Sequence, residues 1–272
     1  MAVAVEEIAA GALSPPLKWA GGKRWLVPHL LPYWIPNLNR RLVEPFVGGL
    51  AVTLGLAPRQ ALINDSSPHL ISFHRWLQRG LDLRPFKARF ANRQTAYLRN
   101  RRRFNELIAQ GEHTEAEAAA LFYYLNRTGF NGLCRFNASG YFNVPFGRYK
   151  NLTYRDDFLE YKKALAGFEI CQGDFECLRI RSADLIYADP PYDVAFTNYS
   201  AGGFGWNDQV RLANWLASHP GPVIASNQAT RRVLKLYRSL GFTIRILSAP
   251  RRISCNGNRD DAREMLALKN VE

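Results

Sequence analysis

The sequence predicts an α/β protein with a mostly parallel sheet, helices on both faces of the sheet, and an inserted, mainly helical domain. Short apolar runs bounded by turn residues recur toward both ends of the 272-residue chain, with helical patterns between several of them. The middle of the chain carries helical patterns without a convincing pair of strands. These observations indicate one main domain with an insertion, large enough to bury a sizeable core.

The individual elements follow from apolar periodicity and turn residues. A helix is predicted over 207–218, and a second runs from about 228 to 240, where Gly241 ends it. In the middle, Thr114 and Glu117 resemble a capping box for a helix through 118–124, with Gly129 just past its end. Strands are predicted at 42–46, 61–64, 185–188, 223–226 and 242–247. The predicted units are a disordered tail over 1–14, a main domain over 15–66 and 165–272, and an insertion over 67–164.

Basic residues outnumber acidic ones, with 36 Lys and Arg against 23 Asp and Glu and a formal charge of +13. This excess favours a polyanionic partner, either nucleic acid or an anionic membrane surface. The membrane is disfavoured because no segment approaches about 18 uninterrupted apolar residues and the start carries Glu6 and Glu7 instead of a basic region. We expect a soluble intracellular protein. Because the cysteines and histidines show no ligand spacing, we expect neither disulfides nor a metal site.

Asp189, Pro190, Pro191 and Tyr192 follow the apolar run 184–188. Two prolines cannot continue a hydrogen-bond ladder, so the strand ends with free carbonyls at the carboxyl edge of the sheet, where ligands of open α/β sheets bind. The Asp189 carboxylate and the Pro190 carbonyl offer two acceptors to a planar NH2 group, and Tyr192 can stack on the ring that carries it. The alternative is an ordinary strand exit with a solvated Asp189.

A glycine turn follows the first predicted strand, at Phe46, Gly48 and Gly49. Such a turn lets a cofactor approach the backbone closely, but the spacing is not G-x-G-x-x-G, which disfavours a dinucleotide. Asp65 ends the next strand, 17 residues after Gly48, where an acidic side chain commonly binds ribose hydroxyls. The pattern favours a nucleoside cofactor without a diphosphate, with ordinary loop residues as the alternative.

Near the start, two lysines and a tryptophan surround a glycine pair, in the order Lys18, Trp19, Ala20, Gly21, Gly22, Lys23. One lysine can meet a carboxylate, and Trp19 can cover a cofactor, with packing in the core as the alternative for Trp19.

The insertion contains two segments, 126–137 and 142–150, in which Arg, Asn, aromatic and Gly residues alternate. This mixture suits base-edge hydrogen bonds, stacking and phosphate contacts. Arg135 can pair with a guanine edge, and Asn131 with a base or a phosphate. The alternative is a Gly-rich hairpin whose aromatic residues pack on the helices of the insertion.

Five motifs occur in a fixed order: K-W-A-G-G-K, E-P-F-V-G-G, N-R-T-G-F-N-G-L-C-R, F-N-V-P-F-G-R-Y-K and D-P-P-Y. A sixth, R-R-x-I-S-x-N-G, is nearly matched at 251–257. Together they resemble the Dam family of DNA adenine-N6 methyltransferases, over about 17–269 and in the order of its alpha class. The resemblance implies a Rossmann-like fold that uses S-adenosylmethionine, releases S-adenosylhomocysteine, needs no metal, and carries a DNA target-recognition insertion.

The resemblance also implies roles for individual residues. Asp189, Pro190 and Tyr192 would form the catalytic site. The cofactor would be bound by Trp19, Lys23, Phe46, Gly48, Asp65, Asp174 and Asp189. DNA would be contacted by Lys18, Phe130, Asn131, Leu133, Arg135, Pro145, Arg148 and Tyr149.

Family members act on adenine in GATC of double-stranded DNA, so Arg135 would read a guanine there. The resemblance leads us to expect a monomeric, cytoplasmic protein of a prokaryote or a phage. Phe130 stands where some relatives have Tyr, and 193–205 differs from several relatives in length and composition. Two alternatives stay open: an amino-methyltransferase that acts on RNA or a protein glutamine, and a decayed methyltransferase that only binds DNA.

Overall fold

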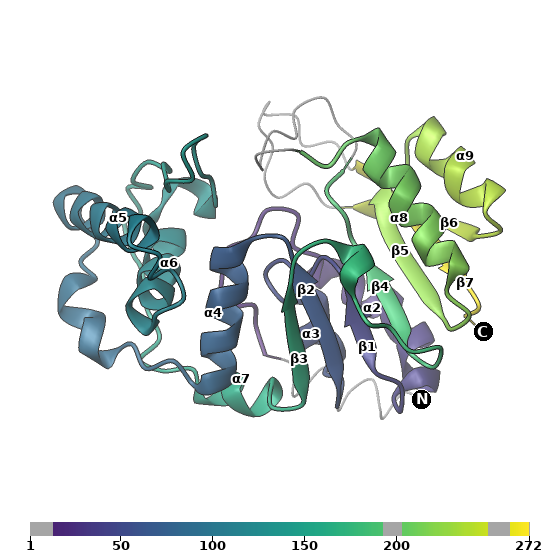
Figure 1. Ribbon diagram of the computed structural model, residues 1–272, viewed down its shortest axis with the longest axis horizontal. Helices are drawn as coiled ribbons and strands as arrows, with labels where there is room; N and C mark the ends of the chain where they lie inside the picture. The colour runs from purple at the N-terminus through teal and green to yellow at the C-terminus, as the bar shows by residue number, and fades with distance from the viewer. Residues whose placement is uncertain (1–12, 193–202, 250–261, 272) are drawn as a thin grey trace.

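The computed structural model describes residues 13–192, 203–249 and 262–271. Within them, seven strands form one sheet in the order β3-β2-β1-β4-β5-β7-β6 (Figure 1). The strands from β3 to β5 pair in parallel, and β7 is antiparallel to both β5 and β6. Their bounds are β1 Leu42–Glu44, β2 Ala61–Asp65, β3 Phe168–Gln172, β4 Leu185–Ala188, β5 Val223–Gln228, β6 Thr243–Ala249 and β7 Ala262–Lys269.

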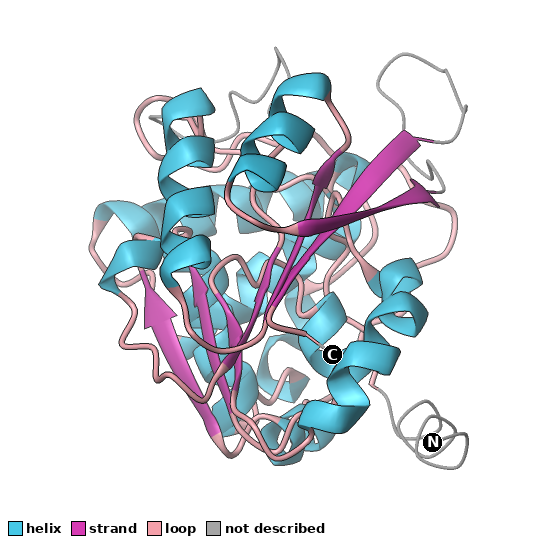
Figure 2. Ribbon diagram, turned by 90° about the vertical axis from the view of Figure 1, so that its right-hand side faces the viewer, coloured by secondary structure: helices cyan, strands magenta, loops and turns pink. Residues whose placement is uncertain are grey.

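Helices cover both faces of the sheet, which confirms the predicted Rossmann-like α/β class (Figure 2). The helices are α2 Val27–Trp34, α3 Ala51–Leu56, α4 Pro68–Arg79, α5 Gln94–Ala109, α6 Ala116–Thr128, α7 Leu159–Ala164, α8 Trp206–Ser218 and α9 Arg231–Ser239. Short 3-10 helices are η1 Arg24–Leu26, η2 Ile35–Asn37, η3 Arg84–Arg89, η4 Phe130–Gly132 and η5 Phe175–Cys177. None of the described helices is long and apolar enough to cross a membrane.

Successive strand residues point to opposite faces, so each central strand contributes to two cores. Leu185 and Tyr187 of β4 pack into the core that includes α2, α3 and α4, whereas Ile186 packs into the core beneath α8 and α9. All three are at most 1% exposed. Burying such a side chain stabilises the fold by roughly 1.5–3 kcal/mol, which explains why the strand is apolar throughout.

Several predicted elements differ from the structure. Strands β3 and β7 were not predicted, because half-exposed side chains interrupt β3 and polar residues begin β7. Helix α9 begins at Arg231 rather than 228, since Thr230 caps it through the Val233 amide. The capping box was wrong: α6 begins at Ala116 without a side-chain cap, and Glu117 instead accepts hydrogen bonds from two arginines, Arg89 and Arg103. Gly129 follows the end of α6, as predicted.

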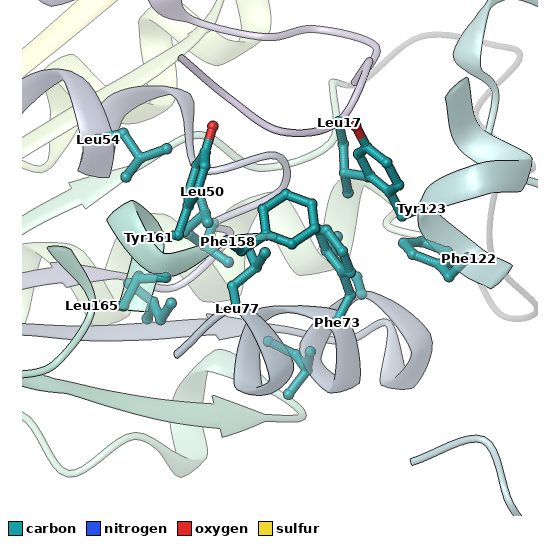
Figure 3. Close-up of a cluster of buried hydrophobic side chains, with 14 of the residues drawn as sticks. Leu17, Leu50, Leu54, Phe73, Leu77, Phe122, Tyr123, Phe158, Tyr161 and Leu165 are labelled. Carbon is teal, nitrogen blue, oxygen red and sulfur yellow. The ribbon is translucent and has the colours of Figure 1, made fainter. Parts of the chain in front are cut away.

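Helix α4 connects the sheet to the predicted insertion. It packs against β2 and β3 on one side and against α6 and α7 on the other (Figure 1). Figure 3 shows Phe73 of α4 among the rings of Tyr123 and Phe158, with centroid distances of 6.1 and 5.9 Å. One continuous core therefore joins both regions. The boundaries at 66 and 164 stay a prediction, and most of the predicted tail lies outside the described residues.

Candidate active site

The glycine turn and the D-P-P-Y segment meet at the carboxyl ends of two neighbouring strands. Strands β1 and β4 pair in parallel, with Leu42 opposite Leu185, so the residues that follow them lie at the same edge. A cavity of about 440 Å³ opens there, which we call the central cavity. Its lining includes Trp19, Lys23, Glu44, Phe46, Gly48, Asp65, Leu133, Cys134, Asp189, Pro190 and Tyr192.

The glycine turn is shaped by close contact with Trp19. A Cβ atom at Gly48 would lie 2.7 Å from Trp19 Nε1, and one at Gly49 would lie 2.8 Å from Trp19 Cβ. Gly48 also has a φ of +48°, a conformation that glycine adopts without strain. Larger residues would therefore displace Trp19, the side chain that forms one wall of the central cavity.

Both polar groups of the Gly48 backbone are bound. Its N–H donates to Asp65 Oδ2 at 3.2 Å, and its carbonyl oxygen lies 2.7 Å from His74 Nε2. Burial lowers the pKa of His74 to about 4, so the ring is neutral near pH 7. Since a carbonyl only accepts, Nε2 carries the proton and donates, which leaves the buried Nδ1 without a proton or a partner. His74 thus holds the glycine turn through the tautomer that carries its proton on Nε2.

Asp65 lines the central cavity at the end of β2. Besides the Gly48 amide, its carboxylate accepts the Ser67 amide at 3.0 Å, and burial raises its pKa. A carboxylate offers about four lone-pair sites, so two amides leave room for ribose hydroxyls.

Asp189 is held by a cation and a hydroxyl. Lys23 Nζ lies 3.1 Å from its Oδ1, and Ser226 Oγ donates to the same atom at 2.8 Å. Ser226 is itself 2.8 Å from the buried Tyr187 hydroxyl. Burial raises the pKa of Asp189, and the positive charge of Lys23 opposes that rise. Asp189 therefore keeps a fixed orientation beside the prolines.

Two further carboxylates surround Lys23 and Asp189. Glu44, at the end of β1, is fully buried and accepts a hydrogen bond from Thr53. Burial and the neighbouring Asp189 raise the pKa of Glu44 well above its usual range, which favours its neutral form. Glu264 of β7 accepts the Tyr192 hydroxyl at 2.6 Å and lies 3.6 Å from Lys23 Nζ. The carboxyl edge thus holds the Lys23 ammonium group between Asp189 and Glu264, with the buried Glu44 near Asp189.

The residues that were predicted to contact DNA come from the N-terminal segment, from the short helix η4 and from the loops that follow it. We call them the recognition surface: Lys18, Phe130, Asn131, Leu133, Arg135, Pro145, Arg148 and Tyr149. Phe130, Asn131, Arg135, Pro145 and Arg148 are exposed, whereas Lys18, Leu133 and Tyr149 are half-buried.

Hydrogen bonds within the loops orient this surface. Arg135 donates to the side chain and the carbonyl of Asn143, at 2.8 and 3.3 Å, and Phe130 donates its amide to the Pro145 carbonyl at 2.9 Å. Lys18 Nζ lies 3.5 Å above the Tyr149 ring. Leu133 reaches the central cavity, so the surface and the cavity share one boundary.

Comparison with known proteins identifies the family of the chain. A family model described as D12 class N6 adenine-specific DNA methyltransferase matches residues 19–253. The DNA adenine methylase of Vibrio cholerae is 38% identical over 270 residues, which cover 93% of this chain and 94% of that protein. The chain belongs to this D12 class family. It is an adenine-specific DNA methyltransferase.

Two more relatives match nearly the whole chain. The retron Ec67 DNA adenine methylase of Escherichia coli is 36% identical over 267 residues, with 94% of this chain and 91% of that protein covered. The type II methyltransferase M1.LlaDCHI of Lactococcus lactis is 36% identical over 270 residues, with 92% of each chain covered. For this methyltransferase, the family implies S-adenosylmethionine as methyl donor and DNA as substrate.

One residue of the predicted cofactor set, Asp174, does not line the central cavity of the methyltransferase. Asp174 is exposed, caps the short helix η5, and forms an ion pair with Arg211 at 2.8 Å. Its proposed contact with the cofactor adenine stays a prediction. The segment 251–257 lies outside the described residues, as do 193–202.

Sequence reasoning missed several residues that hold the methyltransferase site together. Glu44 stood in a recognised motif, directly before Pro45, and its position at a strand end was a usable signal. His74, Ser226 and Glu264 carried none, because each lies inside a helix or strand and far in sequence from its partner. Among the described residues, no group of His, Cys, Asp and Glu is arranged to bind a metal.

Proposed function

We propose that this methyltransferase transfers the methyl group of S-adenosylmethionine to N6 of an adenine flipped out of double-stranded DNA, within GATC. The observation that carries the proposal is the shared cavity. Residues suited to a nucleoside, Phe46 and Asp65, line the same space as Asp189 and Pro190, whose oxygens suit an amino group. Leu133 of the recognition surface lines it too.

The lining fits a nucleoside cofactor. The glycine turn lets Trp19 pack directly on the backbone as one wall of the cavity, and Phe46 supplies a second aromatic wall. The Asp65 carboxylate suits ribose hydroxyls. When bound, S-adenosylmethionine supplies an electrophilic methyl carbon on a sulfonium sulfur. The carboxylates of Asp65 and Asp189, which line the cavity, suit the positive sulfonium and ammonium groups.

N6 is hidden in a stacked base pair, so the adenine must leave the helix at a cost of a few kcal/mol. Asp189 and the Pro190 carbonyl accept hydrogen bonds from the two N–H groups of N6. These bonds favour an N6 lone pair directed out of the ring plane. Tyr192 stacks on the ring. N6 forms a bond to the methyl carbon while the carbon–sulfur bond breaks and its electrons stay on sulfur.

The methylated N6 cation is acidic and releases its proton without a dedicated base. Asp189 acts as an orienting and charge-stabilising group, and positioning supplies much of the rate enhancement. Gln209 supports this geometry, because it donates to the Pro191 carbonyl at 2.7 Å and is itself bound by Asn227.

The target sequence follows from the likeness of the recognition surface to the Dam family, in which Arg135 would meet a guanine edge. Incubation of unmethylated GATC-containing plasmid with the protein and S-adenosylmethionine should block a nuclease that GATC methylation inhibits. Sequencing of the modified sites gives the target directly. Complete cleavage at GATC, together with methylation at other sites, would refute GATC as the target sequence. Methyl transfer to RNA alone would refute DNA as the substrate.

A further inference from the structure

Glu264 lies next to the proposed catalytic residues without lining the central cavity. Its side chain is 8% exposed. Oε1 accepts the hydrogen bond of the Tyr192 hydroxyl at 2.6 Å and lies 3.6 Å from Lys23 Nζ. Because Glu264 faces neither ligand directly, any effect on the reaction must pass through the residues that it holds.

The backbone fixes Glu264 firmly. Strand β7 is hydrogen-bonded on both sides, and Glu264 lies opposite Gln228 of β5 and Leu247 of β6. A residue in the middle of a three-strand ladder cannot shift without breaking the pairing. Glu264 is thus a rigid anchor for a side chain that comes from a loop.

Tyr192 depends on such an anchor because it follows the two prolines that end β4. Its ring has a cation on one face, with Lys23 Nζ 4.7 Å from the centroid. Lys23 is itself bound between Asp189 and Glu264. The hydroxyl contact fixes the outer end of the ring, while the backbone fixes the inner end. Together these contacts define the plane of the ring.

We propose that Glu264 is a positioning residue for methyl transfer: it holds the Tyr192 hydroxyl and thereby fixes the ring that stacks on the target adenine. This inference rests on the proposed function. A target base that stacks on an unanchored ring places N6 inaccurately, and a misplacement of about 1 Å costs up to about 100-fold in rate.

Four variants test the inference: Glu264→Ala, Glu264→Gln, Tyr192→Phe and the double variant Glu264→Ala with Tyr192→Phe. In single-turnover methyl transfer, Glu264→Ala should be slower by about 10- to 100-fold. Glu264→Gln keeps an oxygen acceptor for the hydroxyl, so it should stay within about threefold of wild type. The double variant should be no slower than the slower single variant, because both changes remove the same hydrogen bond.

A second readout does not require methyl transfer. DNA with 2-aminopurine at the target adenine reports the surroundings of the flipped base by its fluorescence. Glu264→Ala and Tyr192→Phe should change the emission of the bound DNA in the same direction, and Glu264→Gln should leave it unchanged. Glu160→Ala is the matched control, since this glutamate lies on α7 with a side chain that is 65% exposed.

The results distinguish a failure of the proposed function from a failure of the role proposed for Glu264. A wild-type protein without methyl transfer to DNA would refute the proposed function, and this inference with it. With an active wild type, an unaltered rate in Glu264→Ala would overturn the inference alone. Independent, multiplying losses in the double variant would overturn it as well, and so would a Glu264→Gln variant that folds and is as slow as Glu264→Ala. Thermal melting of each variant establishes folding.

Discussion

Beside the central cavity, charged side chains are largely buried and bonded to one another, whereas Arg135 and Arg148 of the recognition surface are exposed. Asp189, Lys23 and Glu264 form a closed set in which each side chain contacts another member. Arg135 is exposed and donates to a single asparagine, Asn143. The two regions therefore differ in how much freedom their functional groups keep.

The difference follows from what each region must do. A buried charge without a partner is costly, so the network at the sheet edge fixes its geometry before any ligand binds. An exposed arginine exchanges its partners at little cost and can turn toward a phosphate or a base. The comparison predicts that changes in the cavity alter the rate, while changes on the surface alter DNA affinity.

The largest effect is expected at Asp189. Asp189→Ala removes one of the two acceptors for N6 and leaves Lys23 without its nearest carboxylate. Methyl transfer should fall by about 100- to 1,000-fold, the usual result of removing one stabilising polar group. DNA affinity, measured by fluorescence anisotropy, should change little. Activity close to wild type, or a loss of DNA binding as large as the loss of rate, would contradict the separation of the two regions.

Asn126 should break that separation because it joins the regions. This buried side chain accepts the Lys18 amide at 2.8 Å and donates to the carbonyls of Lys18 and Gly132 at 2.7 and 3.0 Å. Asn126→Ala leaves these groups without partners, so the free energy of unfolding should fall by about 3 kcal/mol. Affinities for DNA and for S-adenosylhomocysteine should both decrease, since Trp19 follows Lys18.

The matched control is Asn100→Ala, in α5. Asn100 is also buried, and its amide donates to the Arg89 carbonyl within the same region. The Asn100→Ala variant should be less stable than wild type, and its affinity for S-adenosylhomocysteine, measured by calorimetry, should be unchanged. Equal losses of cofactor affinity in both variants would show that Asn126 has no special linking role.

His74 should make the folded protein less stable as the pH falls. Its pKa is about 4 in the folded protein, below the usual 6.5, so the unfolded chain takes up the proton first as the pH falls. The contribution of His74 to the free energy of unfolding is fully present above pH 6.5 and is lost as the pH falls toward 4. Between pH 7 and 5 the loss should be about 2 kcal/mol.

The variant His74→Gln isolates this contribution, because its amide can donate to the Gly48 carbonyl without titrating. Urea unfolding of both proteins from pH 7.5 to 4.5 should show the extra loss only in wild type. Burial also lowers the pKa of His69 to about 4. Because His69 is present in both proteins, its effect on the pH dependence cancels. Parallel pH profiles would mean that His74 has the same pKa in the folded and unfolded states.

The smallest effect is expected on the recognition surface. Arg135→Ala should weaken binding to the target sequence by about tenfold and binding to unrelated DNA much less, because a base contact carries sequence information. Arg59→Ala is the control, since Arg59 is exposed just before β2, at the amino edge of the sheet. Equal losses for both DNA sequences would assign Arg135 to phosphate binding instead.

Much of the site could be predicted because its chemistry is local. The prolines at 190 and 191 end a strand wherever that strand lies, and the glycines at 48 and 49 allow a tight turn by themselves. The order of the motifs identified the family, which the family model confirmed. Strands β3 and β7 were missed because an edge position and a polar start removed the apolar periodicity on which strand prediction depends.

The sequence by itself determined the α/β class, the family and the residues at the strand ends, because each depends on neighbours within a few positions. Only the tertiary structure decided which distant groups meet. Tyr192 and Glu264 are 72 residues apart, and Lys18 and Asn126 are 108 apart. Burial then completes these pairs, since a polar group withdrawn from water is stable only with a partner at hydrogen-bond distance. The D-P-P-Y segment is recognisable from its sequence, but the orientation of Tyr192 depends on Glu264 in a strand near the carboxyl end of the chain.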